Sequence, residues 1–141
     1  MAGPPREHDL SSIWLFSACT PGQLRTIGRA FEEQQVPAGR VLCEEGTIGL
    51  DFFFILEGTV SVRRGSRTVA ALGPGQYFGE LSLLDRKPRS ATVVSETDLT
   101  VLRTDHRHFN NLLDDSPELA HQLLVAMSAR LRRADEQAFG S

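Results

Sequence analysis

The spacing of apolar residues changes twice along the chain, from a helical period to a strand period and back again. Near the N-terminus, Leu24, Ile27 and Phe31 recur at the spacing of one helical face. The dipeptide Thr20-Pro21 precedes this face and offers an N-cap followed by proline at the first helical position. The pattern therefore predicts a helix that begins at Pro21.

A shorter helix is predicted over residues 10–16, where Ser11 or Ser12 can supply the N-cap. The preceding residues 1–10 are mostly polar and contain proline, and they lack the apolar core of a signal peptide. We expect them to form a flexible lead.

Between residues 33 and 103 the segments are short and are separated by glycine. Turn signals at such close intervals predict an all-β sandwich or barrel. Residues 59–62 and 100–103 alternate between apolar and polar side chains, which is typical of half-buried strands. The strands are expected over residues 40–43, 51–57, 59–64, 67–72, 91–95 and 97–103.

Helical spacing returns after residue 104. Asp105 is a suitable N-cap for a short helix over residues 105–113, and Ser116-Pro117 opens a longer one. The apolar face of the longer helix either packs on its own β-domain or forms the seam of a homodimer. This face carries Leu119, Leu123, Met127 and Leu131, with Leu124 beside it.

Composition narrows the possible functions. The chain has 141 residues, which corresponds to one domain, and its formal net charge of −3 argues against a nucleic-acid-binding surface. Its longest apolar run, residues 52–56, has the length of a strand and not of a membrane span. Cys19 and Cys43 show no metal-binding spacing, so we expect buried, unreactive thiols in a cytoplasmic protein.

Two short motifs carry the most specific chemistry. The motif F-G-E-L-S-L begins at Phe78, and R-S-A-T begins at Arg89. Gly79 lets the backbone approach a ligand closely, and exposed amides at the start of the following turn attract phosphate. Arg89 supplies a planar donor fork, Ser90 a hydroxyl, and Ala91 room for its own amide to point at a ligand. Together these features predict a site for a small anionic sugar phosphate.

This pair of motifs resembles the phosphate-binding cassette of cyclic nucleotide-binding domains. The resemblance implies that Arg89 pairs with the charged exocyclic oxygen of the cyclic phosphate, and that Glu80 accepts a hydrogen bond from the ribose 2′-hydroxyl. Backbone amides near Gly79, Leu81 and Ala91 would complete the phosphate cradle. The expected ligand-binding residues are Phe78, Gly79, Glu80, Leu81, Ser82, Arg89, Ser90 and Ala91, with Val62 and Leu72 in an apolar wall.

The resemblance covers about residues 10–135 and implies an α+β domain: an eight-stranded, jelly-roll-like β-roll flanked by N-terminal and C-terminal helices. The glycines at positions 39, 46, 49 and 58 match turn positions of the family. After the lead, residues 11–114 would form the β-roll with its N-terminal helices, and residues 115–141 the C-terminal helix.

The function implied is a non-catalytic sensor whose final helix moves when the ligand binds and relays the signal to an output domain or effector protein. Cyclic AMP is favoured over cyclic GMP, because many bacterial cyclic AMP receptors also carry serine at the position of Ser90. Arg130 and Arg133 are candidates for capping the base. No metal, cofactor or nucleic acid is expected as a partner of this chain.

Three alternative hypotheses concern the metal-binding residues, the ligand and the rest of the protein. His106-x-His108 matches the metal pair of a cupin, but Glu118 is too distant and too helical to complete that site. A docking module of the same fold that binds no ligand is disfavoured by the presence of Arg89 and Glu80. The chain could also be the ligand-binding part of a transcription regulator, because it stops at Ser141 without a helix-turn-helix.

Overall fold

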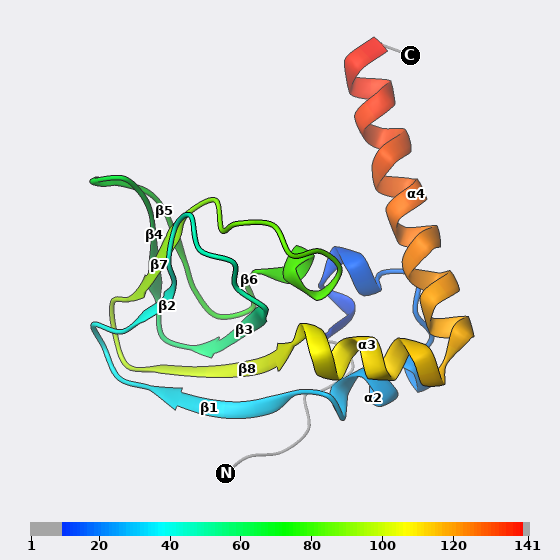
Figure 1. Ribbon diagram of the computed structural model, residues 1–141, viewed down its shortest axis with the longest axis horizontal. Coiled ribbons are helices and arrows are strands. Elements are labelled where there is room, and N and C mark those ends of the chain that lie inside the picture. The colour runs from blue at the N-terminus through cyan, green and yellow to red at the C-terminus, as the bar shows by residue number, and fades with distance from the viewer. Residues whose placement is uncertain (1–9, 140–141) are drawn as a thin grey trace.

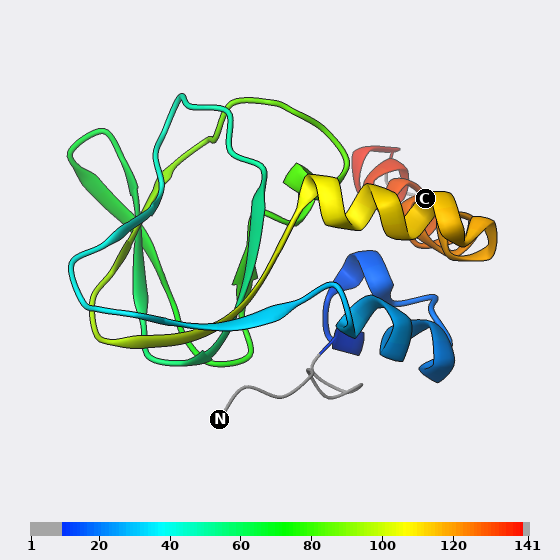
Figure 2. The ribbon, with the colours of Figure 1, turned by 60° about the horizontal axis from the view of Figure 1, so that its bottom comes forward.

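The computed structural model describes residues 10–139 and places two antiparallel sheets at one end and most of the helices at the other (Figure 1). The first sheet has the order β1 (Glu32–Val36), β8 (Leu99–Asp105), β3 (Asp51–Glu57) and β6 (Tyr77–Phe78). The second has the order β2 (Val41–Cys43), β7 (Thr92–Ser95), β4 (Val60–Arg64) and β5 (Arg67–Leu72). The view in Figure 2 shows the same division between the strands and the helical end. The predicted eight-stranded β-roll with flanking helices is confirmed.

Two of the eight strands were missed by the sequence pattern. β1 carries the polar sequence EEQQV and nevertheless pairs along its whole length with β8. β6 pairs with β3 but has only two residues, so it is too short to show a periodic pattern. Both strands are specified by their partners and not by their own composition.

The central strands β8 and β3 of the first sheet are buried on both faces. One face packs against the helices through Phe52, Phe54 and Leu102, while the opposite face packs against the second sheet. The adjacent residues Val101 and Leu102 are therefore both buried, and the prediction that residues 100–103 form a half-buried strand is wrong. Strands covered on two sides lose the period of two that marks a half-buried strand.

The helices are the 3₁₀ helices η1 (Trp14–Phe16) and η2 (Glu80–Leu83) and the α-helices α2 (Pro21–Gly28), α3 (His106–Asp115) and α4 (Pro117–Phe139). Thr20 forms the predicted cap of α2, since its side chain accepts from the amide of Gln23 and the Gln23 side chain accepts from the amide of Thr20. Asp105 caps α3 by accepting from the amide of His108.

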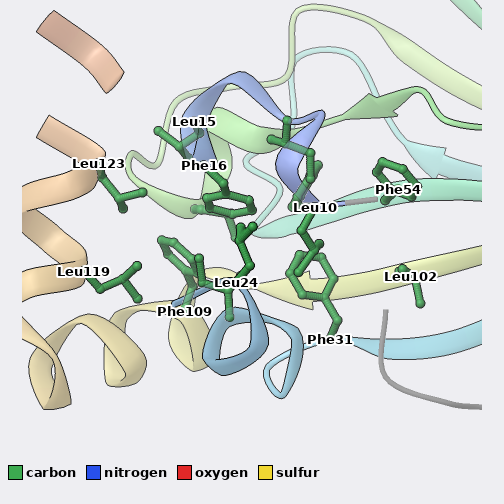
Figure 3. Packing of buried hydrophobic residues seen from close by; sticks show 14 residues of the cluster. Leu10, Leu15, Phe16, Leu24, Phe31, Phe54, Leu102, Phe109, Leu119 and Leu123 are labelled. Atoms are coloured by element: carbon green, nitrogen blue, oxygen red, sulfur yellow. The ribbon is translucent and has the colours of Figure 1, made fainter. Parts of the chain in front are cut away.

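The helix predicted over residues 10–16 is interrupted. Residues 10 and 11 are helical, η1 follows, and its N-cap is Ile13, which makes no side-chain cap, so neither Ser11 nor Ser12 caps it. Leu10 is fully buried, whereas the rest of the predicted flexible lead lies outside the described residues. Figure 3 shows Leu10, Leu15 and Phe16 in the core shared with the helices.

The buried side chains of the long helix α4 all lie in its first half. Leu119 and Leu123 are buried in the helix-side core (Figure 3). Met127 is 38% exposed and Leu131 is 65% exposed, and the end of α4 extends away from the rest of the molecule (Figure 1). No helix among residues 10–139 is long and apolar enough to span a membrane.

Candidate functional site

A cavity of about 500 Å³ lies between the second sheet and the segment that contains η2. All ten residues expected to bind the ligand line it, although they come from β4, β5, the segment from β6 to η2, and the loop that precedes β7. These are Val62, Leu72, Phe78, Gly79, Glu80, Leu81, Ser82, Arg89, Ser90 and Ala91. The other lining residues were not predicted from the sequence, and they are Cys43, Ala70, Asp85, Lys87, Pro88 and Val93.

The backbone turns sharply at Gly79, between β6 and η2. Gly79 has φ +82° and ψ +14°, a left-handed conformation that favours glycine. Within residues 10–139, the amides of Glu80 and Leu81 donate no hydrogen bond, and neither do those of Ser90 and Ala91 across the cavity. Two pairs of unused N–H groups therefore lie along the cavity lining, where an anionic ligand can accept from them.

Arg89 is held in place by neutral oxygen atoms. Its Nη1 donates to Ser82 Oγ at 2.8 Å, and its Nη2 donates to the Asp51 carbonyl oxygen at 2.7 Å. No carboxylate in the described part of the chain forms an ion pair with Arg89, and its buried Nε has no hydrogen-bond partner there. A partly buried guanidinium that is oriented but not neutralised favours an anion in the cavity that it lines.

Two glycines make room for this guanidinium. A Cβ atom at Gly49 would collide with Arg89, and one at Gly79 would lie 2.6 Å from Arg89 Nη1 and 2.7 Å from the Asp51 carbonyl oxygen. Gly49 has no positive φ, so glycine is required at this position by the close approach of Arg89 and not by the backbone conformation of a turn. The family resemblance implied only a turn position for Gly49, and its place beside Arg89 was not predicted from the sequence.

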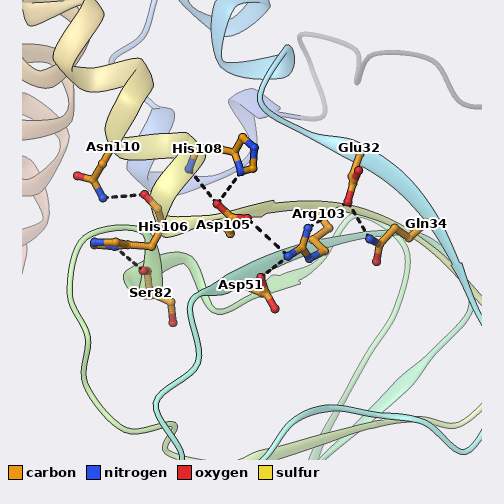
Figure 4. Close-up of polar contacts among 9 residues, drawn as sticks. All are labelled: Glu32, Gln34, Asp51, Ser82, Arg103, Asp105, His106, His108 and Asn110. Atoms are coloured by element: carbon orange, nitrogen blue, oxygen red, sulfur yellow. Dashed lines mark hydrogen bonds and ion pairs between the residues drawn. The ribbon is translucent and has the colours of Figure 1, made fainter.

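A polar network continues from Asp51 to the helical end (Figure 4). Arg103 Nη2 pairs with Asp51 Oδ1 at 2.8 Å and lies 3.6 Å from Asp105 Oδ2. Burial disfavours the charged carboxylate of Asp105, but hydrogen bonds from the backbone and side chain of His108 and the charge of Arg103 hold its pKa below the ordinary value. The segment that fixes Arg89 is thus also fixed to the start of α3.

The two histidines of the His106-x-His108 pair have different partners. His106 Nδ1 lies 3.1 Å from the Ser82 carbonyl oxygen, whereas His108 Nδ1 lies 2.8 Å from Asp105 Oδ1 (Figure 4). Among residues 10–139, no group of three or more His, Cys, Asp or Glu side chains is arranged to hold a metal ion. The histidines therefore do not form the metal pair that their spacing suggested.

Cys43 belongs to the apolar part of the lining. Burial raises its pKa to about 11, with a smaller lowering effect from Arg89 and a smaller raising effect from Asp51. Burial likewise raises the pKa of Cys19 to about 11. Both thiols are free and are protonated at neutral pH, so Cys43 offers the cavity an uncharged wall.

The candidate base-capping residues do not reach the cavity. Neither Arg130 nor Arg133 lines it, and Arg130 instead lies over the ring of Trp14, with its guanidinium carbon 4.2 Å from the ring centroid. None of the lining residues comes from α4. In this arrangement of α4, the cavity has no cap from the C-terminal helix.

Comparisons with known proteins agree with this geometry. The family model described as the cyclic nucleotide-binding domain matches residues 33–116, more than half of the chain. A cyclic nucleotide-gated potassium channel of Mesorhizobium japonicum is 40% identical over 111 residues, which are 79% of this chain and 31% of the channel. The chain thus spans about a third of the length of that relative.

Two solved structures are similar over most of the chain. The N-terminal domain of a transcriptional regulator from Streptomyces coelicolor A3(2) superposes with a TM-score of 0.84 at 31% identity, covering 93% of this chain and 95% of that domain. The regulatory domain of Toxoplasma gondii PKA, solved with cAMP, gives a TM-score of 0.70 at 30% identity, covering 79% of this chain and 44% of the other. With its β-roll and its cassette, the chain belongs to the cyclic nucleotide-binding domain family.

Proposed function

We propose that this domain is a non-catalytic sensor whose ligand is cyclic AMP. The observation that carries the proposal is Arg89, a guanidinium that lines the cavity, is oriented by Ser82 and Asp51, and has no carboxylate partner among the described residues. The singly charged cyclic phosphate supplies the missing anion, and it also accepts from the unused amides of Glu80 and Ala91.

The rest of the cavity suits a nucleoside. Its volume of about 500 Å³ falls in the range of about 300–1,000 Å³ typical of small-molecule sites. Val62, Leu72 and Leu81 supply apolar surface for the base or the sugar, and the Leu81 side chain is 49% exposed. The Glu80 carboxylate lines the same cavity and is available to accept from a ribose hydroxyl.

Two observations support cyclic AMP as the ligand. The similar regulatory domain of Toxoplasma gondii PKA was solved with cAMP. Ser90 lines the cavity, in accordance with the serine of many bacterial cyclic AMP receptors. Cyclic GMP is the competing ligand, and a direct comparison of affinities decides between them.

The proposed output is a change in α4. Beyond Leu123, this helix contacts the described residues through few buried side chains, and Leu124, Met127 and Leu131 remain exposed. If the domain binds the ligand more tightly with α4 in one position than in another, the ligand raises the population of that position. The exposed side chains provide a surface for an output domain, an effector protein or a second copy of this chain, in the cytoplasmic setting that the free thiols favour.

The test is calorimetric titration of the folded chain with cyclic AMP, with cyclic GMP and, as a control, with 5′-AMP. Saturable one-site binding of a cyclic nucleotide but not of 5′-AMP is expected, with cyclic AMP the tighter of the two. Absence of heat and of thermal stabilisation with both cyclic nucleotides would overturn the proposal and favour a docking module of the same fold.

A further inference from the structure

A closed ring of hydrogen bonds connects the cassette with the start of α3. Arg89 donates to the hydroxyl of Ser82 and to the carbonyl of Asp51. The carbonyl of Ser82 contacts His106 Nδ1 at 3.1 Å, and the amide of His106 donates to the carbonyl of Leu50 at 2.8 Å. Since Leu50 and Asp51 are adjacent, the ring closes through one peptide unit. His106 is the residue of this ring that belongs to α3, and its imidazole points toward Ser82 (Figure 4).

The chemistry of this contact fixes the proton on His106. A carbonyl oxygen only accepts hydrogen bonds, so Nδ1 must carry the hydrogen and donate it to Ser82. Ser82 is only 7% exposed, and the amide three residues further on, that of Asp85, donates to the carbonyl of Leu81 instead of that of Ser82. His106 Nδ1 is the hydrogen-bond partner of the Ser82 carbonyl within residues 10–139, and its loss leaves a buried acceptor unpaired.

The backbone of His106 is itself well anchored. His106 follows the N-cap Asp105. Its amide donates to the carbonyl of Leu50, and its carbonyl accepts from Asn110 Nδ2 at 2.7 Å. The imidazole thus projects from a fixed base and restrains the position of η2. η2 in turn presents the hydroxyl that orients Arg89.

We propose that His106 is a positioning residue of the nucleotide site. It does not line the cavity, and it acts through Ser82 on the orientation of the Arg89 guanidinium. This inference rests on the proposed cyclic nucleotide function, because the affinity that His106 supports is the affinity for the cyclic phosphate.

The first experiment measures cyclic AMP affinity by calorimetry in His106→Ala, His106→Asn and, as a control, His121→Ala. His106→Ala is expected to weaken binding about 2- to 15-fold, the equivalent of one lost hydrogen bond. His106→Asn places an amide N–H near the position of Nδ1 and is expected to recover most of that loss. His121 is exposed on α4, and its replacement is expected to leave the affinity unchanged. Wild-type affinity in a folded His106→Ala protein would overturn the proposal.

A double-mutant cycle with Ser82→Ala separates positioning from a general loss of structure. If His106 acts through the Ser82 hydroxyl, His106→Ala is expected to change affinity less than about twofold once that hydroxyl is absent. Effects that multiply in the double mutant would show that the two residues act independently, and they would overturn the proposed route.

A measurement without ligand keeps this inference distinguishable from the proposed function. The Arg89 Nε–H resonance in ¹H–¹⁵N spectra, assigned by its loss in Arg89→Lys, is expected to shift in His106→Ala and to stay in place in His121→Ala. A shifted resonance in a protein that binds no cyclic nucleotide would refute the function and retain the structural link. An unmoved resonance would refute the link itself.

Discussion

The guanidinium of Arg89 occupies the space into which a side chain at Gly49 would project. Gly49 precedes β3, while Arg89 precedes β7 in the other sheet, so the contact joins two distant parts of the chain. Gly49 contributes to the site only by lacking a side chain, and the position of the Arg89 guanidinium depends on that lack.

Gly49→Ala is expected to weaken cyclic AMP binding by about tenfold or more, because the new methyl group displaces the guanidinium from its oxygen partners. The measurement is calorimetric titration. Gly73→Ala is the matched control: Gly73 also lies in a loop without positive φ, and its added Cβ would meet only the Thr59 methyl group at 3.9 Å. Equal affinities for the two variants would show that Arg89 tolerates a side chain at Gly49.

Arg89→Leu is expected to weaken cyclic AMP binding by about tenfold to a thousandfold, because the charge-assisted contact is lost and the phosphate remains unpaired. Arg86→Leu removes the same charge from the same loop at an exposed position that does not line the cavity, and its affinity is expected to stay within about threefold of the wild type. Unchanged binding by a folded Arg89→Leu protein would remove Arg89 from the site.

The parts of the molecule that could be predicted from the sequence are those whose structure depends on residues close together in the chain. The apolar run of β3 gave its bounds correctly, and the cassette motif identified eight of the residues that line the cavity, because these are near neighbours in the chain. Gly49 and His106 were not recognised, since their contacts with Arg89 and Ser82 depend on pairing between segments far apart in sequence. The polar strand β1 was missed for the same reason: β8 supplies its hydrogen bonds.

Leu119→Ala is expected to lower the free energy of unfolding by about 2–5 kcal/mol, because Leu119 is 1% exposed in the helix-side core. Leu131→Ala, on the exposed half of the same helix, is expected to change it by no more than about 0.5 kcal/mol. Urea denaturation followed by circular dichroism measures both. A comparable loss in Leu131→Ala would indicate that the end of α4 is buried in solution, for example against a second copy of the chain.

The N-cap Asp105 is expected to contribute stability that depends on pH. Its pKa in the folded protein is held below the ordinary value of 3.8, so the charged form stabilises the fold above that pH. The contribution is lost as the pH falls through the lowered folded pKa. Asp105→Asn keeps a capping oxygen without the titration, so the difference in unfolding free energy between wild type and variant is expected to be present at pH 5 and to shrink in more acidic solution.

Urea unfolding across that pH range measures this difference. Asp114→Asn, at an exposed position of the same helix, serves as the control and is expected to stay within about 0.5 kcal/mol of the wild type. A wild-type advantage over Asp105→Asn that persists unchanged into acid would contradict the assigned role of the carboxylate.

Trp14 offers a direct measurement of α4, because it is the single tryptophan of the chain and Arg130 of α4 lies over its ring. A cation at 4.2 Å from the ring centroid stabilises this position of the helix and alters the emission of the indole. If the ligand moves α4, Trp14 emission is expected to change during a cyclic AMP titration, and the midpoint of this change should equal the midpoint of binding measured by calorimetry. Arg130→Gln is expected to shift the emission of the free protein and to reduce the ligand-induced change, whereas Arg133→Gln, on the same helix but without the ring contact, is expected to do neither. Saturation by calorimetry without any change in Trp14 emission would mean that α4 keeps its place on η1, and that the output of this domain passes through another element.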